Sequence, residues 1–203
     1  MKTIKLANKI YSPSKIICIG LNYVEHVEEL SNEIPDEVVI FSKPNSAITS
    51  TLNSHHNEQL HYETELCFIY GEGNYIGVGV GLDLTKRSLQ TELRKKGLPW
   101  ERAKAFNGAA LFSEFVPLPE TLESLFFQLS INGIIKQSGS IDLMINKPLK
   151  ILNEISSFMN LVEGDVVMTG TPKGVGTVNS GDTFHIQLFS NNTQLVDKLW
   201  TAN

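Results

Sequence analysis

The apolar residues of this chain fall into short, β-branched runs, most of which are bounded by Gly, Pro, Asn or Asp. Such runs are typical of β-strands, because branched side chains pack well on a pleated sheet and turn residues end each run. We therefore predict strands over residues 16–19, 38–41, 63–69, 75–82, 125–131, 134–137, 165–169, 183–189 and 194–199. Between two of these runs, Asn132-Gly133 is typical of the tight turn of a β-hairpin.

Three segments have a helical pattern. Residues 22–30 follow a glycine and are rich in Glu, and residues 85–96 end at Gly97, a common helix stop. The third segment, residues 148–159, has Pro in its first turn. Its spacing predicts a buried face made of Leu149, Leu152, Ile155 and Met159. Because helices and strands do not alternate regularly, the predicted fold class is α+β with a β-rich core.

Composition limits the possible function classes. The 203 residues contain 17 Lys and Arg against 22 Asp and Glu, a formal charge of −5, which argues against a nucleic-acid partner. No apolar run approaches the roughly 20 residues of a membrane helix, and no secretory signal is visible. The two cysteines, Cys18 and Cys67, lie in apolar runs, which favours a reduced, cytoplasmic chain. With no linker or repeat, residues 1–203 are expected to form one domain.

Three carboxylates are candidate metal ligands. On a strand, Glu63 and Glu65 point to the same side because they are two residues apart. Asp83 ends a glycine-interrupted apolar run, where a buried strand would deliver one more acidic group. A lone Glu-x-Glu is more often a solvated strand face, and Asp83 is what favours a shared site. If the three carboxylates share a site, their oxygen ligands suit Mg²⁺ or Mn²⁺ rather than Zn²⁺.

Two further features admit both a functional and a structural interpretation. His26 and Glu29 are three residues apart on a predicted helix, which is consistent with a general base oriented by a carboxylate or with a plain surface ion pair. Residues 170–176, Gly-Thr-Pro-Lys-Gly-Val-Gly, match neither a phosphate loop nor a dinucleotide-binding turn. They are consistent with a tight turn that offers its amides and the Thr171 hydroxyl to an anion, or with an ordinary loop.

Taken together, the motifs resemble the fumarylacetoacetate hydrolase family over most of the chain. The resemblance starts with the residues Lys-Ile-Ile-Cys-Ile-Gly-Leu-Asn-Tyr at 15–23, followed by Val-Glu-His at 24–26. It continues through Phe-Ser-Lys-Pro at 41–44, His-Tyr-Glu-Thr-Glu at 61–65 and Leu-Asp-Leu-Thr at 82–85. Lys-Gly-Leu-Pro-Trp at 96–100 leads to Lys104, and Glu-Gly-Asp at 163–165 precedes Thr-Gly-Thr-Pro-Lys-Gly-Val-Gly at 169–176. The order and spacing of these motifs make the resemblance specific.

The resemblance implies a β-rich α+β roll with mixed sheets, of the fumarylacetoacetate hydrolase C-terminal-domain type, usually assembled as a homodimer. It implies an enzyme that uses Mg²⁺ or Mn²⁺ and acts on small 2-keto or 2,4-diketo acids. By matching positions, the metal ligands would be Glu63, Glu65 and Asp83. The catalytic residues would be His26, Glu29 and Lys104, and the substrate-binding residues would be Arg87, Gln90 and Thr171.

The expected reaction is hydrolysis of the C–C bond of a 2,4-diketo acid of the acylpyruvate or fumarylpyruvate type. Oxaloacetate decarboxylation or tautomerisation is the alternative, together with isomerisation or hydration of a 2-keto-enoic acid, because the same ligands serve all of these reactions. A non-catalytic binding module would have no chemical reason to keep the whole residue set. The chain carries Leu21 where some acylpyruvase-like members carry Arg, which removes one anchor for a substrate carboxylate.

Overall fold

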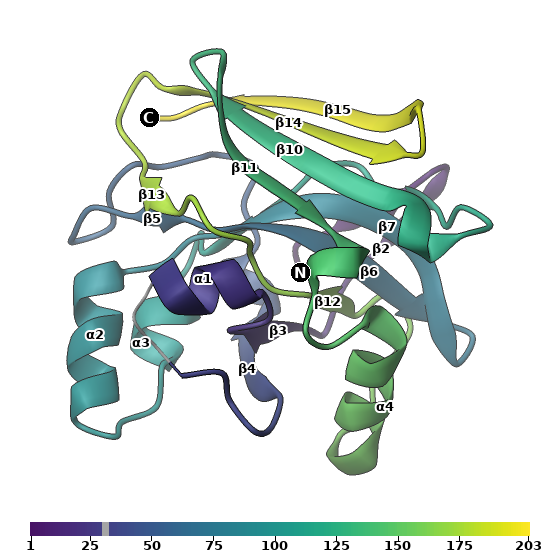
Figure 1. Ribbon diagram of the computed structural model, residues 1–203, viewed down its shortest axis with the longest axis horizontal. Coiled ribbons are helices and arrows are strands. Elements are labelled where there is room, and N and C mark those ends of the chain that lie inside the picture. Colours follow the sequence, from purple (N-terminus) through teal and green to yellow (C-terminus); the bar gives the residue numbers. More distant parts are fainter. Residues whose placement is uncertain (30–32) are drawn as a thin grey trace.

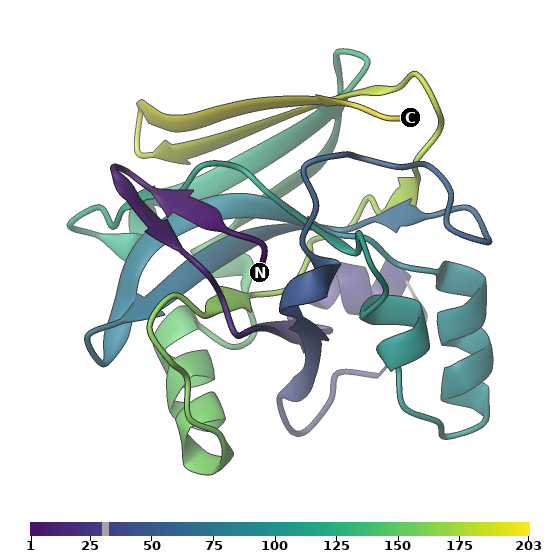
Figure 2. The same ribbon diagram turned by 180° about the vertical axis from the view of Figure 1, so that it is seen from behind.

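The computed structural model describes residues 1–29 and 33–203, so Leu30, the predicted end of the first helix, lies outside the described residues. Strands dominate the described part of the chain, with a few short helices between them, as predicted. Two sheets lie across one another, and the helices lie below the larger sheet in the view of Figure 1. Figure 2 shows the same arrangement from behind, with the N-terminal strands beside the larger sheet.

The larger sheet is mixed. Its strand order within the described residues is β4-β3-β12-β6-β7-β8, with β9 paired to β7 as the seventh strand. Strand β12 pairs parallel with β3 and antiparallel with β6, and therefore joins the two halves of the sheet. The strands are β3 (Lys15–Gly20), β4 (Val39–Pro44), β6 (Thr64–Gly71), β7 (Asn74–Asp83), β8 (Ala110–Phe112), β9 (Val116–Pro117) and β12 (Val166–Met168).

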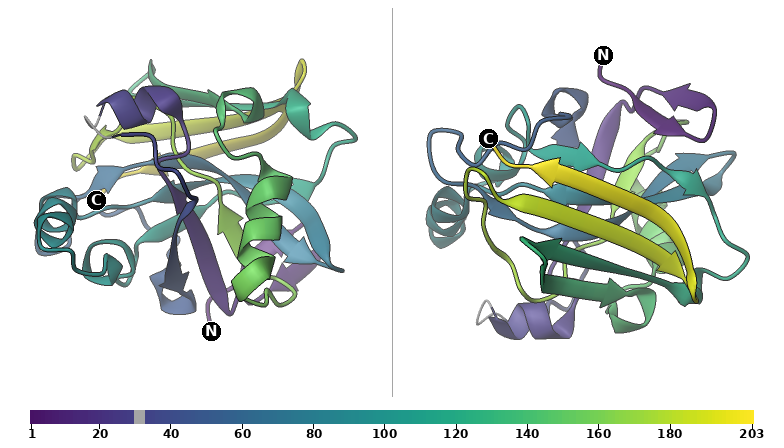
Figure 3. Two further views of the ribbon diagram at one scale, coloured as in Figure 1. Left: turned by 60° about the horizontal axis from the view of Figure 1, so that its bottom comes forward. Right: turned by 90° about the horizontal axis from the view of Figure 1, so that it is seen from above.

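The second sheet is antiparallel and is seen from above in the right panel of Figure 3. Its four strands run in the order β11-β10-β14-β15 in the described chain. They are β10 (Leu125–Ile131), β11 (Ile134–Ser140), β14 (Thr183–Ser190) and β15 (Thr193–Thr201). The predicted hairpin turn between β10 and β11 is confirmed: Asn132 and Gly133 have φ of 52° and 80°, as this tight turn requires.

Short elements complete the fold. The helices are α1 (Val24–Glu29), α2 (Arg87–Lys95), α3 (Glu101–Lys104) and α4 (Pro148–Phe158). Two small antiparallel pairs join β1 (Ile4–Leu6) to β2 (Lys9–Tyr11) and β5 (His61–Tyr62) to β13 (Gly176–Thr177). In the part of the chain that the structure describes, 3₁₀ turns occupy Asn45–Ala47, Leu122–Ser124 and Ile141–Leu143. No helix in the described ranges is long and apolar enough to cross a membrane.

One predicted face is wrong in detail. The buried side of α4 consists of Pro148, Ile151, Leu152 and Ile155, whereas Leu149 is 55% exposed. The four buried residues follow the i, i+3, i+4, i+7 spacing that one helix face requires. The predicted spacing of 149, 152 and 155 advances three residues per step and so drifts around a helix of 3.6 residues per turn, which puts Leu149 outside the buried face and Ile151 inside it.

Strand β6 is buried on both faces because it lies between two apolar clusters. Leu66 and Phe68 face the cluster that fills the space below the four-stranded sheet, together with Phe127 of β10. Cys67 and Ile69 face a second cluster, which includes residues of the N-terminal hairpin. A strand enclosed on both sides forms a rigid base for any site at its end.

Asp165 fixes the start of β12 at the centre of the larger sheet. Its carboxylate accepts hydrogen bonds from Ser14 N and Oγ, both at 2.8 Å, and from Val162 N at 3.0 Å. It also pairs with Lys15 Nζ at 2.7 Å and accepts from Lys15 N at 3.1 Å. Burial alone would raise the pKa of this carboxyl, but the Lys15 contact and the other donors outweigh burial and lower it.

We expect Asp165→Asn to reduce the free energy of unfolding by about 3 kcal/mol at pH 7. Both carboxylate oxygens accept hydrogen bonds, so an amide NH₂ must face a donor in either orientation. Because the folded state lowers the pKa, this stabilisation is present above the ordinary carboxyl pKa and is lost as the pH falls through the folded value. The difference in unfolding free energy between the parent protein and the variant should therefore become smaller in acid.

Urea unfolding between about pH 7 and pH 3 measures this difference, with the exposed Asp142→Asn as the control. A difference that grows in acid would contradict the assignment.

Candidate active site

Three buried carboxylates meet where β6 and β7 pair. Glu63 lies just before β6, Glu65 is on β6, and Asp83 is the last residue of β7. One oxygen from each lies within 4.8 Å of one from each of the others. The structure thus brings the three predicted ligands together and removes the alternative of a solvated strand face. Strand pairing explains the meeting, since Thr64 is opposite Leu82 and Asp83 N donates to Glu63 O at 2.8 Å.

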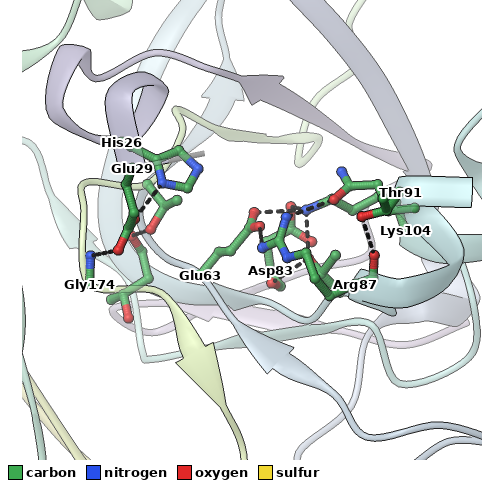
Figure 4. Close-up of polar contacts among 12 residues, drawn as sticks. His26, Glu29, Glu63, Asp83, Arg87, Thr91, Lys104 and Gly174 are labelled. Carbon is green, nitrogen blue, oxygen red and sulfur yellow. Dashed lines mark hydrogen bonds and ion pairs between the residues drawn. The ribbon is translucent and has the colours of Figure 1, made fainter. Parts of the chain in front are cut away.

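Two buried lysines contact this cluster. Lys104, at the end of α3, donates from Nζ to Glu63 Oε2 and Asp83 Oδ2, both at 2.7 Å, and to Thr85 Oγ1 at 2.6 Å. Lys43 of β4 is fully buried, with Nζ 2.6 Å from Asp83 Oδ1, and it also donates to the carbonyl oxygen of Lys104. Figure 4 shows Lys104 and Arg87 extending toward Glu63 and Asp83.

Helix α2 adds a third cation and an amide. Arg87 donates through NH2 to Glu63 Oε1 and through NH1 to Gln90 Oε1, the latter at 2.7 Å. Arg87 and Gln90 share a face because they are three residues apart on the helix. Both line a small cavity together with Glu63, Glu65 and Lys104.

The charges in the cluster are unevenly compensated. Burial alone would raise the pKa of Glu63, but Lys104 and Arg87 outweigh it and hold the pKa well below its usual range. Burial lowers the pKa of Lys104, whereas Asp83 and Glu63 outweigh burial and raise it. Glu65 differs, because burial raises its pKa well above the usual value and the neighbouring Asp83 and Glu63 add to the shift.

The donor set fits a hard divalent cation. Its oxygen atoms come from three carboxylates, which is the ligand type that Mg²⁺ and Mn²⁺ prefer. Glu65 contacts the backbone rather than a cation, since Oε2 accepts from Gly170 N at 2.6 Å. Burial and the neighbouring carboxylates disfavour the ionised form of Glu65. A divalent ion nearby would supply the positive charge that stabilises this form.

His26 and Glu29 lie on α1 at the opposite side of the cavity. His26 is buried and lines the cavity, and its Nδ1 is 3.1 Å from Glu29 Oε2. Glu29 also accepts from Gly174 N through Oε1 at 3.0 Å, as Figure 4 shows. Only glycine fits at position 174, because φ is 96° and a Cβ would lie 2.1 Å from Lys136 O. The glycine turn therefore binds an anion through an amide, and this anion is the carboxylate of Glu29.

Thr171 reaches the same cavity, and a buried amide holds it in place. Its hydroxyl donates to Thr64 O at 2.9 Å and accepts from Gln137 Nε2 at 2.8 Å. Gln137 also accepts from Thr64 N through Oε1 at 3.0 Å and donates to Pro172 O at 2.9 Å. The four-stranded sheet, which carries Gln137 on β11, thereby fixes Thr171 next to the carboxylate strand.

All nine predicted site residues come from segments far apart in sequence and meet in this region. Seven of them line the cavity: His26, Glu63, Glu65, Arg87, Gln90, Lys104 and Thr171. Asp83 and Glu29 contact residues that line the cavity. Asp83 accepts a hydrogen bond from Lys104, and Glu29 pairs with His26. The cavity is small, with a volume of about 30 Å³. The structure brings these residues together, and the roles assigned to them stay predictions.

Sequence reasoning missed two buried residues that support the site. Lys43 belongs to the Phe-Ser-Lys-Pro motif, so the motif was noticed but its lysine received no role. A lysine within a strand pattern at an otherwise apolar position is a signal of a buried ion pair. Gln137 gave a weaker signal, since an amide at the end of a strand is ordinary in sequence.

Comparisons with known proteins establish the family. Residues 15–198 match the family model described as fumarylacetoacetate (FAA) hydrolase C-terminal, so the chain belongs to this family of enzymes. It is similar to oxaloacetate tautomerase YcgM of Escherichia coli, with 37% identity over 195 residues, covering 85% of this chain and 87% of that protein. It is also similar to human mitochondrial oxaloacetate tautomerase FAHD1, with 36% identity over 185 residues, covering 82% of this chain and 83% of that protein.

Solved structures confirm the expected roll. A protein from Oleispira antarctica, proposed to be a fumarylacetoacetate isomerase/hydrolase, has a TM-score of 0.95 and 32% identity, with 100% of both chains covered. Fumarylpyruvate hydrolase from Pseudomonas aeruginosa, in complex with Mn²⁺ and pyruvate, has a TM-score of 0.87 and 26% identity, covering 99% of this chain and 95% of that chain.

We expect Lys43→Met to reduce the free energy of unfolding by about 3–5 kcal/mol, because it leaves part of the Asp83 charge buried and uncompensated. Urea unfolding measures the loss. Lys5→Met is the matched control, since Lys5 pairs with Glu114 at 3.7 Å in an exposed position and should cost less than about 1 kcal/mol. Equal effects of the two substitutions would contradict a supporting role for Lys43.

Proposed function

We propose that the protein is a divalent-metal-dependent enzyme that interconverts the keto and enol forms of a small 2-oxo acid of the oxaloacetate class. The observation that carries the proposal is the buried cluster of Glu63, Glu65 and Asp83 with the Lys104 ammonium hydrogen-bonded across it. The similarity to proteins named oxaloacetate tautomerase favours this reaction over the C–C hydrolysis expected from the sequence.

In this proposal the three carboxylates hold Mg²⁺ or Mn²⁺, which when bound would act as a Lewis acid on the keto oxygen of the substrate. Lys104 contributes a fixed positive charge beside the oxygen on which negative charge develops. Its three hydrogen bonds to Glu63, Asp83 and Thr85 hold the ammonium in place, so little reorganisation accompanies the reaction. Gln90, oriented by Arg87, and Thr171 contact substrate oxygens.

His26 supplies the base. If Nδ1–H donates to Glu29, the neutral ring carries its lone pair on Nε2. Nε2 then takes a proton from the carbon next to the keto group, and the imidazolium gives a proton to the enolate oxygen, which forms the enol and restores the neutral ring. No C–C bond breaks. The Glu29 carboxylate fixes the ring and stabilises the imidazolium while it holds the proton.

A second candidate is hydrolysis of a 2,4-diketo acid. The His26–Glu29 pair supports it, because the same Nε2 can take a proton from water, whose oxygen then attacks the distal keto carbon. The structural likeness to a fumarylpyruvate hydrolase also supports it.

Further properties of the proposed enzyme are expectations from the sequence and from the family resemblance. A homodimer and a single catalytic domain over residues 1–203 stay predictions, as does the exclusion of nucleic-acid and membrane partners. A cytoplasmic location fits Cys18 and Cys67, which are both buried and unpaired, as expected of a chain kept reduced.

The proposal is tested by supplying oxaloacetate and acetylpyruvate in parallel, with Mg²⁺ and with EDTA. We expect Mg²⁺-dependent acceleration of enol–keto exchange of oxaloacetate, followed by ultraviolet absorbance of the enol, with the carbon skeleton intact. Release of acetate and pyruvate from acetylpyruvate, without any acceleration of exchange, would instead support the hydrolase.

Glu65→Gln should weaken Mn²⁺ binding at least about 100-fold and abolish the metal-dependent rate. An amide keeps an oxygen for Gly170 N but removes the charge that the ion requires. Titration calorimetry with Mn²⁺ measures the affinity, and circular dichroism checks the fold. Glu114→Gln, at a carboxylate that is 73% exposed, is the control and should bind Mn²⁺ as the parent protein does. Tight Mn²⁺ binding by the Glu65 variant would remove this residue from the ligand set.

His26→Gln should lower kcat by about 10²–10⁴-fold with little effect on Mn²⁺ affinity, because it removes the base and leaves the carboxylates in place. Steady-state kinetics with a parallel Mn²⁺ titration separates the two effects. His185→Gln is matched, since His185 also pairs with a carboxylate, Asp197 at 2.8 Å, on the outer sheet. A His26 variant with full activity would assign the base elsewhere.

A further inference from the structure

One turn contacts both halves of the candidate site. It consists of residues 170–174 and follows strand β12. At its start, Gly170 N donates to Glu65 Oε2 at 2.6 Å. At its end, Gly174 N donates to Glu29 Oε1 at 3.0 Å, as Figure 4 shows. The turn therefore connects the carboxylate cluster with helix α1, and its position affects the distance between them.

Helix α1 contacts this turn through two consecutive residues of the turn. Lys173 Nζ pairs with Glu25 Oε1 at 3.0 Å. The next residue, Gly174, donates to Glu29, which lies four residues after Glu25 and so on the same face of the helix. Glu29 also contacts His26 Nδ1 at 3.1 Å. A shift of the turn would therefore move the carboxylate that orients the His26 ring.

A buried amide on the four-stranded sheet holds the turn from its other side. Gln137 of β11 is 1% exposed, and its Nε2 donates to Thr171 Oγ1 at 2.8 Å and to Pro172 O at 2.9 Å. A Cβ on Gly174 would lie 2.1 Å from Lys136 O and 3.3 Å from Gln137 Cγ. The turn thus packs directly on this part of β11, with no space between them.

The same amide holds the residue that separates Glu63 from Glu65. Gln137 Oε1 accepts from Thr64 N at 3.0 Å, and Thr64 O accepts from Thr171 Oγ1 at 2.9 Å. These contacts also determine the orientation of the amide. Exchanging its oxygen and nitrogen would place Nε2 against a backbone donor and Oε1 against a backbone carbonyl. Gln137 therefore joins the carboxylate strand to the turn in one geometry.

We propose that Gln137 is a positioning residue that sets the distance between the base, His26, and the three carboxylates. It does so by holding the turn of residues 170–174 against Thr64. The assignment rests on the proposed function, since it takes His26 as the base. A misplacement of about 1 Å between reacting groups can lower a rate about 100-fold. Hydrogen bonds from one buried side chain to three partners oppose such a misplacement.

The first test separates the rate from metal binding. Gln137→Met keeps the length of the side chain and removes its three hydrogen bonds. We expect kcat for enolisation of oxaloacetate to fall about 10–100-fold, while the Mn²⁺ dissociation constant stays within about threefold of the parent value. Steady-state kinetics and titration calorimetry measure the two quantities. An unchanged kcat, or a loss of Mn²⁺ affinity as large as the loss of kcat, would overturn the assignment.

Gln128→Met is the matched control, because Gln128 lies half-buried on the outward face of the neighbouring strand β10. It should leave both quantities unchanged. Circular dichroism checks the fold of each variant. If Gln137→Met does not fold, Gln137→Asn replaces it, since this side chain keeps the amide but is one methylene too short to reach both Thr64 and the turn.

The second test is a double-mutant cycle with Glu29→Gln. If Gln137 acts through Glu29, the double variant should have a kcat within about threefold of that of Glu29→Gln alone. A residue that only stabilises the fold would affect the rate independently of Glu29, so the two losses would multiply. Multiplied losses would therefore overturn the assignment.

The third test does not depend on turnover. Glu29→Gln replaces the ionised acceptor of the Gly174 amide by a neutral one, so the NMR resonance of this amide proton should move upfield. Gln137→Met should move it in the same direction, and Gln128→Met should leave it in place. An unmoved resonance in Gln137→Met would overturn the assignment. If the parent protein does not enolise oxaloacetate, the proposed function fails, whereas the Gly174 resonance still decides whether Gln137 positions Glu29.

Discussion

The structure depends on the compensation of three buried carboxylates by two buried lysines and an arginine. Placing Glu63, Glu65 and Asp83 within 4.8 Å of one another, away from bulk water, is unfavourable unless positive charge accompanies them. Lys104 bridges two of the three, Lys43 contacts Asp83 from below, and Arg87 reaches Glu63 from α2. These contacts join β4, α2 and α3 to the end of the β6–β7 pair, so the fold around the cluster and the cluster itself stabilise each other.

Glu65 differs from the other two carboxylates, and this difference would allow the cluster to bind a cation. Its carboxylate contacts Gly170 N, and its pKa is raised by burial and by the two other carboxylates. The lysines therefore compensate most of the negative charge of the cluster. The charge of the remaining carboxylate, Glu65, would be compensated by a bound cation. A cluster neutralised entirely by lysines would bind a metal weakly, and one without lysines would disrupt the sheet that carries it.

Much of this arrangement could be predicted because it follows from local spacing. Residues two apart on a strand share a face, so Glu63 and Glu65 were expected together, and Asn132-Gly133 identified its hairpin. Helix α3 is only four residues long, too short for a periodic pattern, so the position of Lys104 came from family motifs alone. Lys43 and Gln137 were missed because their importance comes from partners far away in the sequence, as in the Lys43–Asp83 and Gln137–Thr64 contacts. Hydrophobic periodicity carries no information about such pairs.

The site combines two kinds of support, and this division explains how one family serves several reactions. The carboxylates stand on strands enclosed by apolar clusters on both faces, so their spacing is fixed by the core. His26 and Glu29 stand on a helix of six residues, held by the Gly174 amide and an exposed Lys173–Glu25 pair at 3.0 Å. Of the residues of α1, His26 and Val27 are buried, so this helix makes fewer core contacts than the strands that carry the carboxylates. In the proposed mechanism, a fixed cluster that stabilises an enolate would serve tautomerisation, decarboxylation and C–C hydrolysis alike, whereas the position of His26 would decide whether a proton is taken from carbon or from water.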